Sequence, residues 1–212
     1  MNPTPEKTSV MAPFILMLFL YFIVGLFTVI NQQFQVPLKS ALLPHDGNMT
    51  NALVTLLNFS WFLAYPFSEG FATRWVDRLG YRKTSVYSLL IFIVGLGFYE
   101  AAVLLHIYAP SYITIMGNPI FTGFFVFLSG SFVIGMAVTI LQVVTGLYLD
   151  VNPVGKTTPL QRQMIGGTTN SIGMAIGPLV VSYIIFYGIP LHNVQSREFI
   201  WPVICLIAII CI

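Results

Sequence analysis

Long apolar stretches alternate with short polar connections along almost the whole chain. An apolar helix needs about 20 residues to cross about 30 Å of hydrocarbon, at a rise of about 1.5 Å per residue. The first five stretches meet that length, whereas the sixth has about 14 residues and reaches only about 21 Å. The pattern therefore predicts an all-α integral membrane protein with six spans, the last cut short, over residues 12–38, 49–75, 84–105, 120–149, 164–187 and 199–212.

The composition agrees with a membrane protein. Hydrophobic residues make up 57% of the chain and charged residues only 8%, against about 25% charged residues in soluble domains. The first apolar stretch is too long for the core of a secretion signal, so we expect a span there. The net charge of +2 argues against a nucleic-acid partner. No spacing typical of a phosphate loop, a metal site or a catalytic triad is present, so we expect no cofactor and no enzymatic activity.

Lysine and arginine fall mainly on one side of the predicted spans. If the N-terminus is cytoplasmic, seven of the nine lie in inner segments and two in outer loops. The inner seven are Lys7, Arg74, Arg78, Arg82, Lys83, Lys156 and Arg162, and the outer two are Lys39 and Arg197. Because positive residues favour the cytoplasmic side, we expect this orientation, in a bacterial inner membrane.

Two short motifs each occur twice, at nearly the same offset. A glycine is followed seven residues later by a glutamine, and an asparagine is followed eight residues later by a proline. The copies are Gly25 and Gln32, Gly135 and Gln142, Asn58 and Pro66, and Asn170 and Pro178, with offsets of 110 and 112 residues. Three helices cross a membrane an odd number of times, so a second copy of such a unit runs inverted. We therefore predict a bundle built from a 3+3 inverted repeat.

The connection between the second and third spans has a distinctive sequence, Asp-Arg-Leu-Gly-Tyr-Arg-Lys at residues 77–83, whose glycine permits a tight turn. It resembles the loop between helices 2 and 3 of the major facilitator superfamily, although Thr73 stands where that family usually has a glycine. The loop is interpreted either as a latch that holds the inner gate shut or as a signal for membrane orientation alone. The residues concerned are Asp77, Arg78, Gly80, Arg82 and Lys83, with Asp150 as the expected partner of the basic side chains.

Carboxamide side chains gather near the end of the first span. Inside an apolar span they are costly unless they face a cavity or a partner. They donate and accept hydrogen bonds at once, as the hydroxyls of a neutral sugar do. At helical spacing, one face carries Thr28, then Asn31 or Gln32, then Gln35. Sugar contact and bonding between helices are the two alternatives for the set Asn31, Gln32, Gln33 and Gln35.

Two more carboxamides lie in later spans. Gln142 lies deep in the fourth span and needs a polar partner. Asn170 shares a face of the fifth span with Gly167 and Gly177, and Pro178 can kink that helix. Each carboxamide is a candidate sugar contact, with helix packing as the alternative.

Residues 162–178 are similar to the fifth helix of the fucose, glucose and galactose permease family of sugar symporters. The matches are Arg162, Asn170, Ser171, Gly173 and Pro178. The resemblance implies a twelve-helix transporter whose sugar site lies near the membrane midplane, between this six-helix bundle (residues 1–212) and a second bundle expected after Ile212.

The ion that drives transport is a separate question. Proton-coupled members of that family carry acids at the positions of Gln33 and Gln142, and a carboxamide does not take up or release a proton. Uniport, coupling to sodium, or proton coupling at another residue are therefore the alternatives. Glu69 and Glu100 are candidates because an acid inside a membrane span is a functional hypothesis by default, with an ion pair to Arg74 as the structural alternative for Glu69.

We therefore predict a secondary transporter that moves a neutral hexose by alternating access. A drug or metabolite antiporter of the same superfamily is one alternative, since Gly173, Gly177 and Pro178 resemble part of an antiporter motif on helix 5. A half-bundle that binds a partner without transport is the other.

Overall fold

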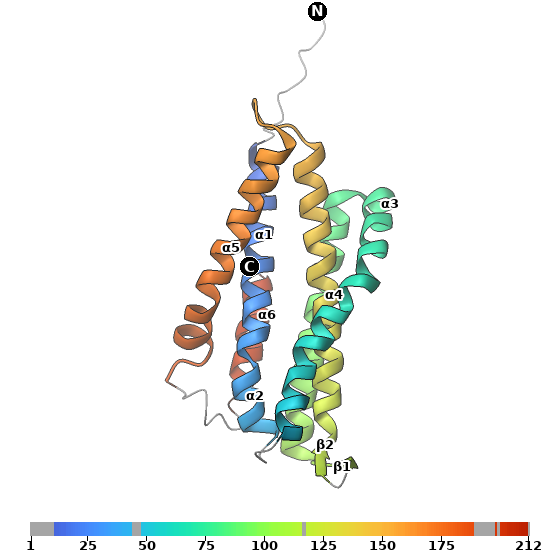
Figure 1. Cartoon of the computed structure of the whole chain (residues 1–212), viewed down its shortest axis with the longest axis vertical. Helices are drawn as coiled ribbons and strands as arrows, with labels where there is room; N and C mark the ends of the chain where they lie inside the picture. The colour runs from blue at the N-terminus through green and yellow to red at the C-terminus, as the bar shows by residue number, and fades with distance from the viewer. Residues whose placement is uncertain (1–10, 44–47, 116–117, 189–197, 199, 212) are drawn as a thin grey trace, which may run out of the picture.

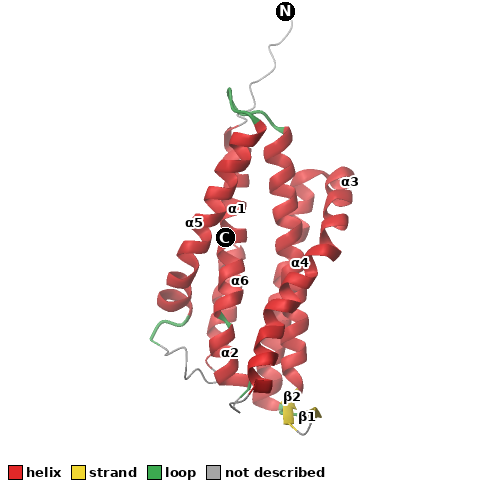
Figure 2. Cartoon of the chain, in the orientation of Figure 1, coloured by secondary structure: helices red, strands yellow, loops and turns green. Residues whose placement is uncertain are grey.

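The computed structural model describes residues 11–43, 48–115, 118–188, 198 and 200–211, and most of these residues are helical (Figure 1) (Figure 2). The long helices run side by side along the long axis of the molecule. In chain order the elements are α1 (Met11–Gln33), α2 (Gln35–Leu42), α3 (Asn48–Tyr108), β1 (Tyr112–Ile115), β2 (Asn118–Phe121), α4 (Thr122–Val151), α5 (Pro159–Val180), the π-helical segment η1 (Val181–Ile185) and α6 (Ile200–Cys211).

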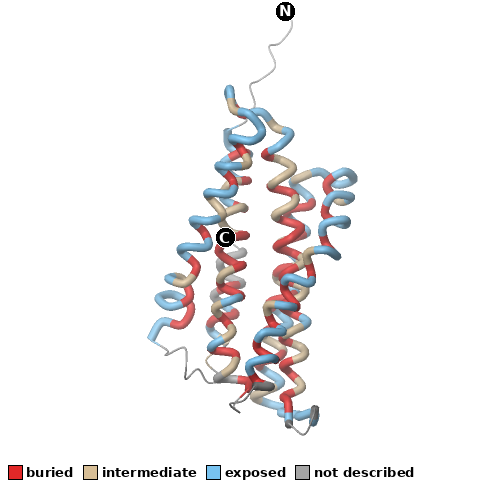
Figure 3. Tube along the Cα trace, viewed as in Figure 1, coloured by how far each residue is buried: buried red, intermediate tan, exposed pale blue. Residues whose placement is uncertain are grey.

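The described residues contain four helical stretches that are long and apolar enough to cross a membrane. They are Met11–Lys39, Thr50–Tyr108, Thr122–Val151 and Pro159–Ile185. Large apolar side chains cover their outer faces, such as Phe19 at 56% and Phe59 at 60% exposure, and the pale outer surfaces are visible in Figure 3. Soluble monomers rarely expose so much apolar surface, so these helices indicate a membrane protein.

Helix α3 reverses direction at Gly80. Its 61 residues would extend about 90 Å as one straight helix, about three times the thickness of a hydrocarbon core. Gly80 has φ 77° and ψ 166°, a conformation open essentially to glycine alone, and Figure 1 shows the chain turning back there. The predicted glycine turn is confirmed. The connection is shorter than the apolar pattern predicts, because helix continues up to Gly80 on one side and resumes directly after it on the other.

Helix α5 begins at Pro159, five residues before the predicted start. Thr158 accepts a hydrogen bond from the backbone N–H of Gln161, and the Gln161 side chain accepts one from the N–H of Thr158. Together with a proline at the first helical position, this capping box is a recognisable helix start that the apolar pattern overlooked. The segment after Pro178 changes from α to π geometry, which agrees with the distortion expected at that proline.

The connection between the third and fourth predicted spans contains a small antiparallel hairpin, which the apolar pattern does not predict. Tyr112 pairs with Phe121 and Thr114 pairs with Pro119. The hairpin lies at the end of the bundle opposite to the start of α1 (Figure 1). It therefore lies away from the polar interior of the bundle.

Two helix crossings bring backbones into direct contact. A Cβ atom on Gly25 of α1 would overlap the backbone carbonyl of Asn170 on α5. A Cβ atom on Gly135 of α4 would lie 2.6 Å from the carbonyl oxygen of Trp61 on α3. Lipid is as apolar as the helices themselves, so helices in a membrane associate through such close packing of small residues. These crossings divide the bundle into an α1–α5 pair and an α3–α4 pair.

We expect Gly80→Ala to lower the free energy of unfolding by about 1–3 kcal/mol, because alanine is strained at this positive φ. The melting temperature of the purified protein in detergent measures the change. Gly70→Ala is the matched control, since Gly70 lies within the same α-helix, has a negative φ, and would place a Cβ atom more than 4 Å from any neighbour. Alanine there is expected to be neutral or to raise stability by up to about 1 kcal/mol. Equal effects of the two variants would contradict the assigned turn.

Candidate functional site

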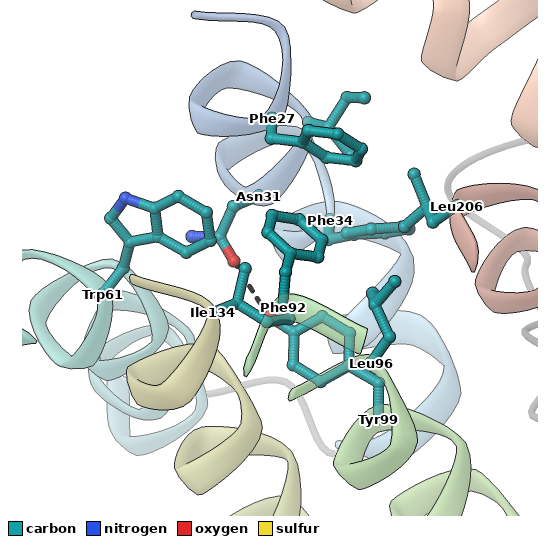
Figure 4. A pocket seen from close by; sticks show the side chains of 10 residues that line it. Phe27, Asn31, Phe34, Trp61, Phe92, Leu96, Tyr99, Ile134 and Leu206 are labelled. Carbon is teal, nitrogen blue, oxygen red and sulfur yellow. Dashed lines mark hydrogen bonds between the residues drawn. The ribbon is translucent and has the colours of Figure 1, made fainter. Parts of the chain in front are cut away.

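A buried hydrogen-bonded cluster joins four helical segments in the middle of the bundle. The Asn31 side chain is 3% exposed, and its Oδ1 accepts a hydrogen bond of 2.9 Å from the Tyr99 hydroxyl (Figure 4). The Ser131 hydroxyl lies 3.1 Å from the carbonyl oxygen of Leu57 and 3.5 Å from Asn31 Oδ1. Because a hydroxyl has one proton, the shorter contact with Leu57 is the stronger bond. The cluster therefore ties α1 to both segments of α3 and to α4.

The four carboxamides of the first span divide among different environments. Asn31 is buried with Thr28, whereas Gln32 is exposed and Gln33 and Gln35 are half-buried. The helix face that contains Thr28 therefore carries Asn31 and not Gln32. The Oδ1 atom of Asn31 joins two helices in this conformation, while its Nδ2 is buried without a hydrogen-bond partner among the described residues, so Asn31 stays a candidate together with the other three.

A small apolar cavity of about 10 Å³ lies beside Asn31. Phe27, Phe92 and Leu206 contribute to its lining (Figure 4). The Tyr99 ring, which also lines it, is stacked on Phe127 at a centroid distance of 3.8 Å. The volume suits about one water molecule, but the lining offers too few polar groups to hold one. We therefore interpret this region as aromatic packing around the Asn31–Tyr99 bond.

A second polar pair lies at the α3–α4 interface. The Tyr65 hydroxyl lies 3.4 Å from Oε1 of Gln142 and donates to it. The same hydroxyl lies close to the side chains of Thr28 and Trp61. Tyr65 and Gln142 are both half-buried, so they are accessible in a way that Asn31 is not. The expectation that Gln142 needs a polar partner is confirmed, and Tyr65 is that partner.

The repeated asparagines share an unusual environment. Asn58 and Asn170 are both half-buried, and each has a buried Oδ1 atom without a hydrogen-bond donor among the described residues. Asn170 packs on Gly25, and Asn58 lies one turn before Trp61, which packs on Gly135. Each asparagine therefore lies at or beside one of the two close helix crossings. The contact of Asn170 with Gly25 explains part of its role as helix packing. Its Oδ1 has no donor among the described residues, so Asn170 stays among the candidate ligand contacts.

The predicted gating residues are exposed. This holds for Asp77, Arg78, Gly80, Arg82 and Lys83 near the α3 turn and for Asp150 near the end of α4. Within the described part of the chain, no hydrogen bond or ion pair joins the Asp150 side chain to a basic side chain of the turn. The expected pairing with Asp150 is therefore not formed in this conformation.

Arg162 organises the turn between α4 and α5 instead. Its side chain is 2% exposed and donates to the backbone carbonyls of Leu149 at 2.6 Å, Asp150 at 2.8 Å and Thr157 at 2.7 Å. The last carbonyls of a helix have no partner within the helix, and a cation there also interacts well with the helix dipole. From the sequence, Arg162 is predicted only as a positive charge and a family match, because no neighbouring residue indicates that its side chain turns inward.

The two candidate acids differ in exposure. The Glu69 side chain is exposed, and no ion pair with Arg74 is present among the described residues, so the expected structural pair is not formed. Glu100 is half-buried, and its Oε2 is buried without a hydrogen-bond partner in the described residues. Across the ranges that the structure describes, neither carboxylate is bonded to the Asn31 cluster or to the Tyr65–Gln142 pair.

Comparison of the chain with protein-family models, with curated proteins and with solved structures finds no match. The resemblance to sugar symporters therefore rests on the residues named above.

We expect Asn31→Ala to destabilise the protein by about 1–3 kcal/mol, because it leaves the buried Tyr99 hydroxyl without its acceptor. Combining it with Tyr99→Phe is expected to recover part of the loss, since removing both polar partners is less costly than removing one. Thermal unfolding measures both effects. Gln32→Ala is the matched control, because Gln32 is the adjacent carboxamide and is exposed. A loss as large in Gln32→Ala as in Asn31→Ala would contradict the assigned bond.

We also expect Arg162→Ala to destabilise the protein by about 3 kcal/mol or more, because three carbonyls lose a charged donor. Arg78→Ala is the control, as an exposed surface change is expected to stay within about 0.5 kcal/mol. Thermal unfolding and resistance to proteolysis between α4 and α5 both report the effect. Unaltered stability of Arg162→Ala would rule out the role assigned to its side chain.

Proposed function

We propose that the chain is a six-helix half of a secondary transporter of the major facilitator type, which moves a neutral hexose by alternating access. The observation that carries the proposal is the uncharged, half-buried pair of Tyr65 and Gln142 between facing helices. A hydroxyl and a carboxamide both donate and accept, which matches the hydroxyls of a sugar. Asn31, Gln32, Gln33, Gln35 and Asn170 are the further proposed contacts.

The helix crossings support an inverted repeat of three plus three helices. Gly25 and Gly135 are the repeat-related glycines, and each lies at a close crossing, α1 with α5 and α4 with α3. Asn58 and Asn170 are the repeat-related asparagines, and each presents a buried Oδ1 without a donor among the described residues. In this arrangement the first span corresponds to the fourth, and the second span corresponds to the fifth. A second six-helix half after Ile212 would complete the transporter.

The distribution of charge supports a cytoplasmic N-terminus in a bacterial inner membrane. The start of α1, the turn of α3 and the α4–α5 connection lie toward the same end of the bundle (Figure 1). Of the seven described lysines and arginines, six lie at or next to this turn and this connection, and Lys39 follows the first span at its other end. The end rich in positive charge is the one that favours the cytoplasm.

The α3 turn is proposed as part of the inner gate. Its exposed Asp77 and basic residues would contact the second half of the transporter when the inner side is closed. The absence of charge on Gln33 and Gln142 favours uniport or coupling through another group, either sodium binding or protonation at Glu69 or Glu100.

Transport by membrane vesicles that contain the full-length protein tests the function. Uptake of labelled glucose, galactose, fucose and N-acetylglucosamine is measured with and without a protonophore and with and without sodium. Accumulation of one of these sugars supports the proposal, and its ion dependence identifies the coupling. Efflux of hydrophobic cations without sugar uptake would favour an antiporter. Inactivity toward both, with the protein present in the membrane, would favour a half-bundle that binds a partner.

We expect Gln142→Ala to reduce sugar uptake about tenfold or more without reducing the amount of protein in the membrane. Its carboxamide is proposed to bond to the sugar, and loss of a polar group that recognises a hydroxyl leaves its ligand unpaired. Ser129→Ala is the matched control on the same helix, because Ser129 is exposed and its hydroxyl donates to the backbone carbonyl of Phe125 on its own helix. Uptake by Gln142→Ala equal to that of the control would remove Gln142 from the site.

A further inference from the structure

Tyr65 lies where three helical segments meet. Its ring is half-buried on the first segment of α3, and its hydroxyl donates to Oε1 of Gln142 on α4. The same hydroxyl lies close to Thr28 of α1 and to Trp61, one turn earlier on its own helix. No motif of the sequence assigns a polar role to this tyrosine, whose ring alone would explain its presence in an apolar helix.

The bond from Tyr65 decides how the Gln142 carboxamide is presented. With one lone pair of Oε1 accepting from the hydroxyl, the two N–H groups of Nε2 point to the other side of the carboxamide and can donate to another partner. Among the described residues, the hydrogen bond found for the Gln142 side chain is the one that Oε1 accepts from Tyr65. A fixed carboxamide with a vacant donor end favours a ligand oxygen over a ligand cation.

The two backbones that carry this pair are held in place independently of it. Gly135 lies seven residues before Gln142, two helical turns away on the same face of α4, and it contacts the Trp61 backbone directly. Trp61 and Tyr65 are four residues apart and share a face of α3. The close crossing therefore limits the distance between the two helices near the Tyr65–Gln142 contact.

The bond between Tyr65 and Gln142 is long for its type. At 3.4 Å it is longer than the about 2.7–2.8 Å typical of bonds between hydroxyl and carbonyl oxygens. A bond of this length can still orient the carboxamide, and it leaves room for the carboxamide to adjust when a ligand binds.

We propose that Tyr65 is a positioning residue for ligand recognition, which holds Oε1 of Gln142 so that the Nε2 donors face a hydroxyl oxygen of the ligand. This inference rests on the proposed transport of a neutral sugar, and it adds to it the residue that sets the orientation of the recognising carboxamide.

The test uses Tyr65→Phe in the full-length protein, which removes the hydroxyl and keeps the ring in contact with Phe62. We expect KM for the transported sugar to rise about two- to tenfold, the change that loss of one neutral hydrogen bond produces, while the maximal rate stays unchanged. Tyr87→Phe, an exposed tyrosine of the same helix, is the control and is expected to leave KM unaltered. An unchanged KM in Tyr65→Phe would overturn the proposal.

A second measurement does not depend on transport. Melting temperatures are compared for Tyr65→Phe, Gln142→Ala and the double variant. We expect the double variant to have the same melting temperature as Gln142→Ala, because without the carboxamide the Tyr65 hydroxyl has no acceptor to hold. Additive shifts would show that the two side chains do not interact and would overturn the positioning role alone. Absence of any sugar uptake by the unmodified protein would instead overturn the transport function and, with it, this role.

Discussion

Close backbone contact at two glycines is the constraint on which the remaining structure depends. In hydrocarbon, apolar side chains gain little by leaving lipid for one another, so helices hold together where small residues allow their backbones to touch. Gly25 provides this contact between α1 and α5, and Gly135 provides it between α3 and α4. Between these helices the Asn31–Tyr99 bond joins α1 to the second segment of α3, and both of its side chains are buried.

The hydrogen bonds between side chains of different helices in the described interior are formed by neutral groups. Asn31, Tyr65 and Gln142 bond through neutral groups, while Arg162 neutralises the end of α4 by donating to carbonyls at the rim of the bundle. Neutral hydrogen-bonding groups suit an uncharged polar ligand, whose own groups also donate and accept. Selectivity at such a site depends on the direction of a few donors and acceptors, and therefore on the side chains that orient them.

The sequence predicted the features that depend on local chemistry. Apolar length predicted the helices, and glycine at residue 80 predicted the reversal of α3, because both follow from the residues themselves. The choice between Asn31 and Gln32 as the inward side chain could not be predicted, since it depends on the rotation of α1 against α4 and α5. The inward orientation of Arg162 could not be predicted either, because it depends on how the start of α5 lies against the end of α4. The α5 start was predictable from its capping box but was overlooked, because apolar content alone defined the helix ends.

The π-helical segment after Pro178 gives the end of α5 a freedom that the rest of the helix lacks. A π turn contains one residue more than an α turn, so converting one into the other rotates everything beyond it by about 100° while backbone hydrogen bonds are kept. Val181 and Ile185 now face inward, and Tyr183 and Ile184 face outward. A change of register at this point would exchange which side chains meet α6, and the Gly25 contact two turns and more away would not move. The part of α5 that contacts Gly25 would thus keep its place, while the segment after Pro178 would turn a different set of side chains toward α6.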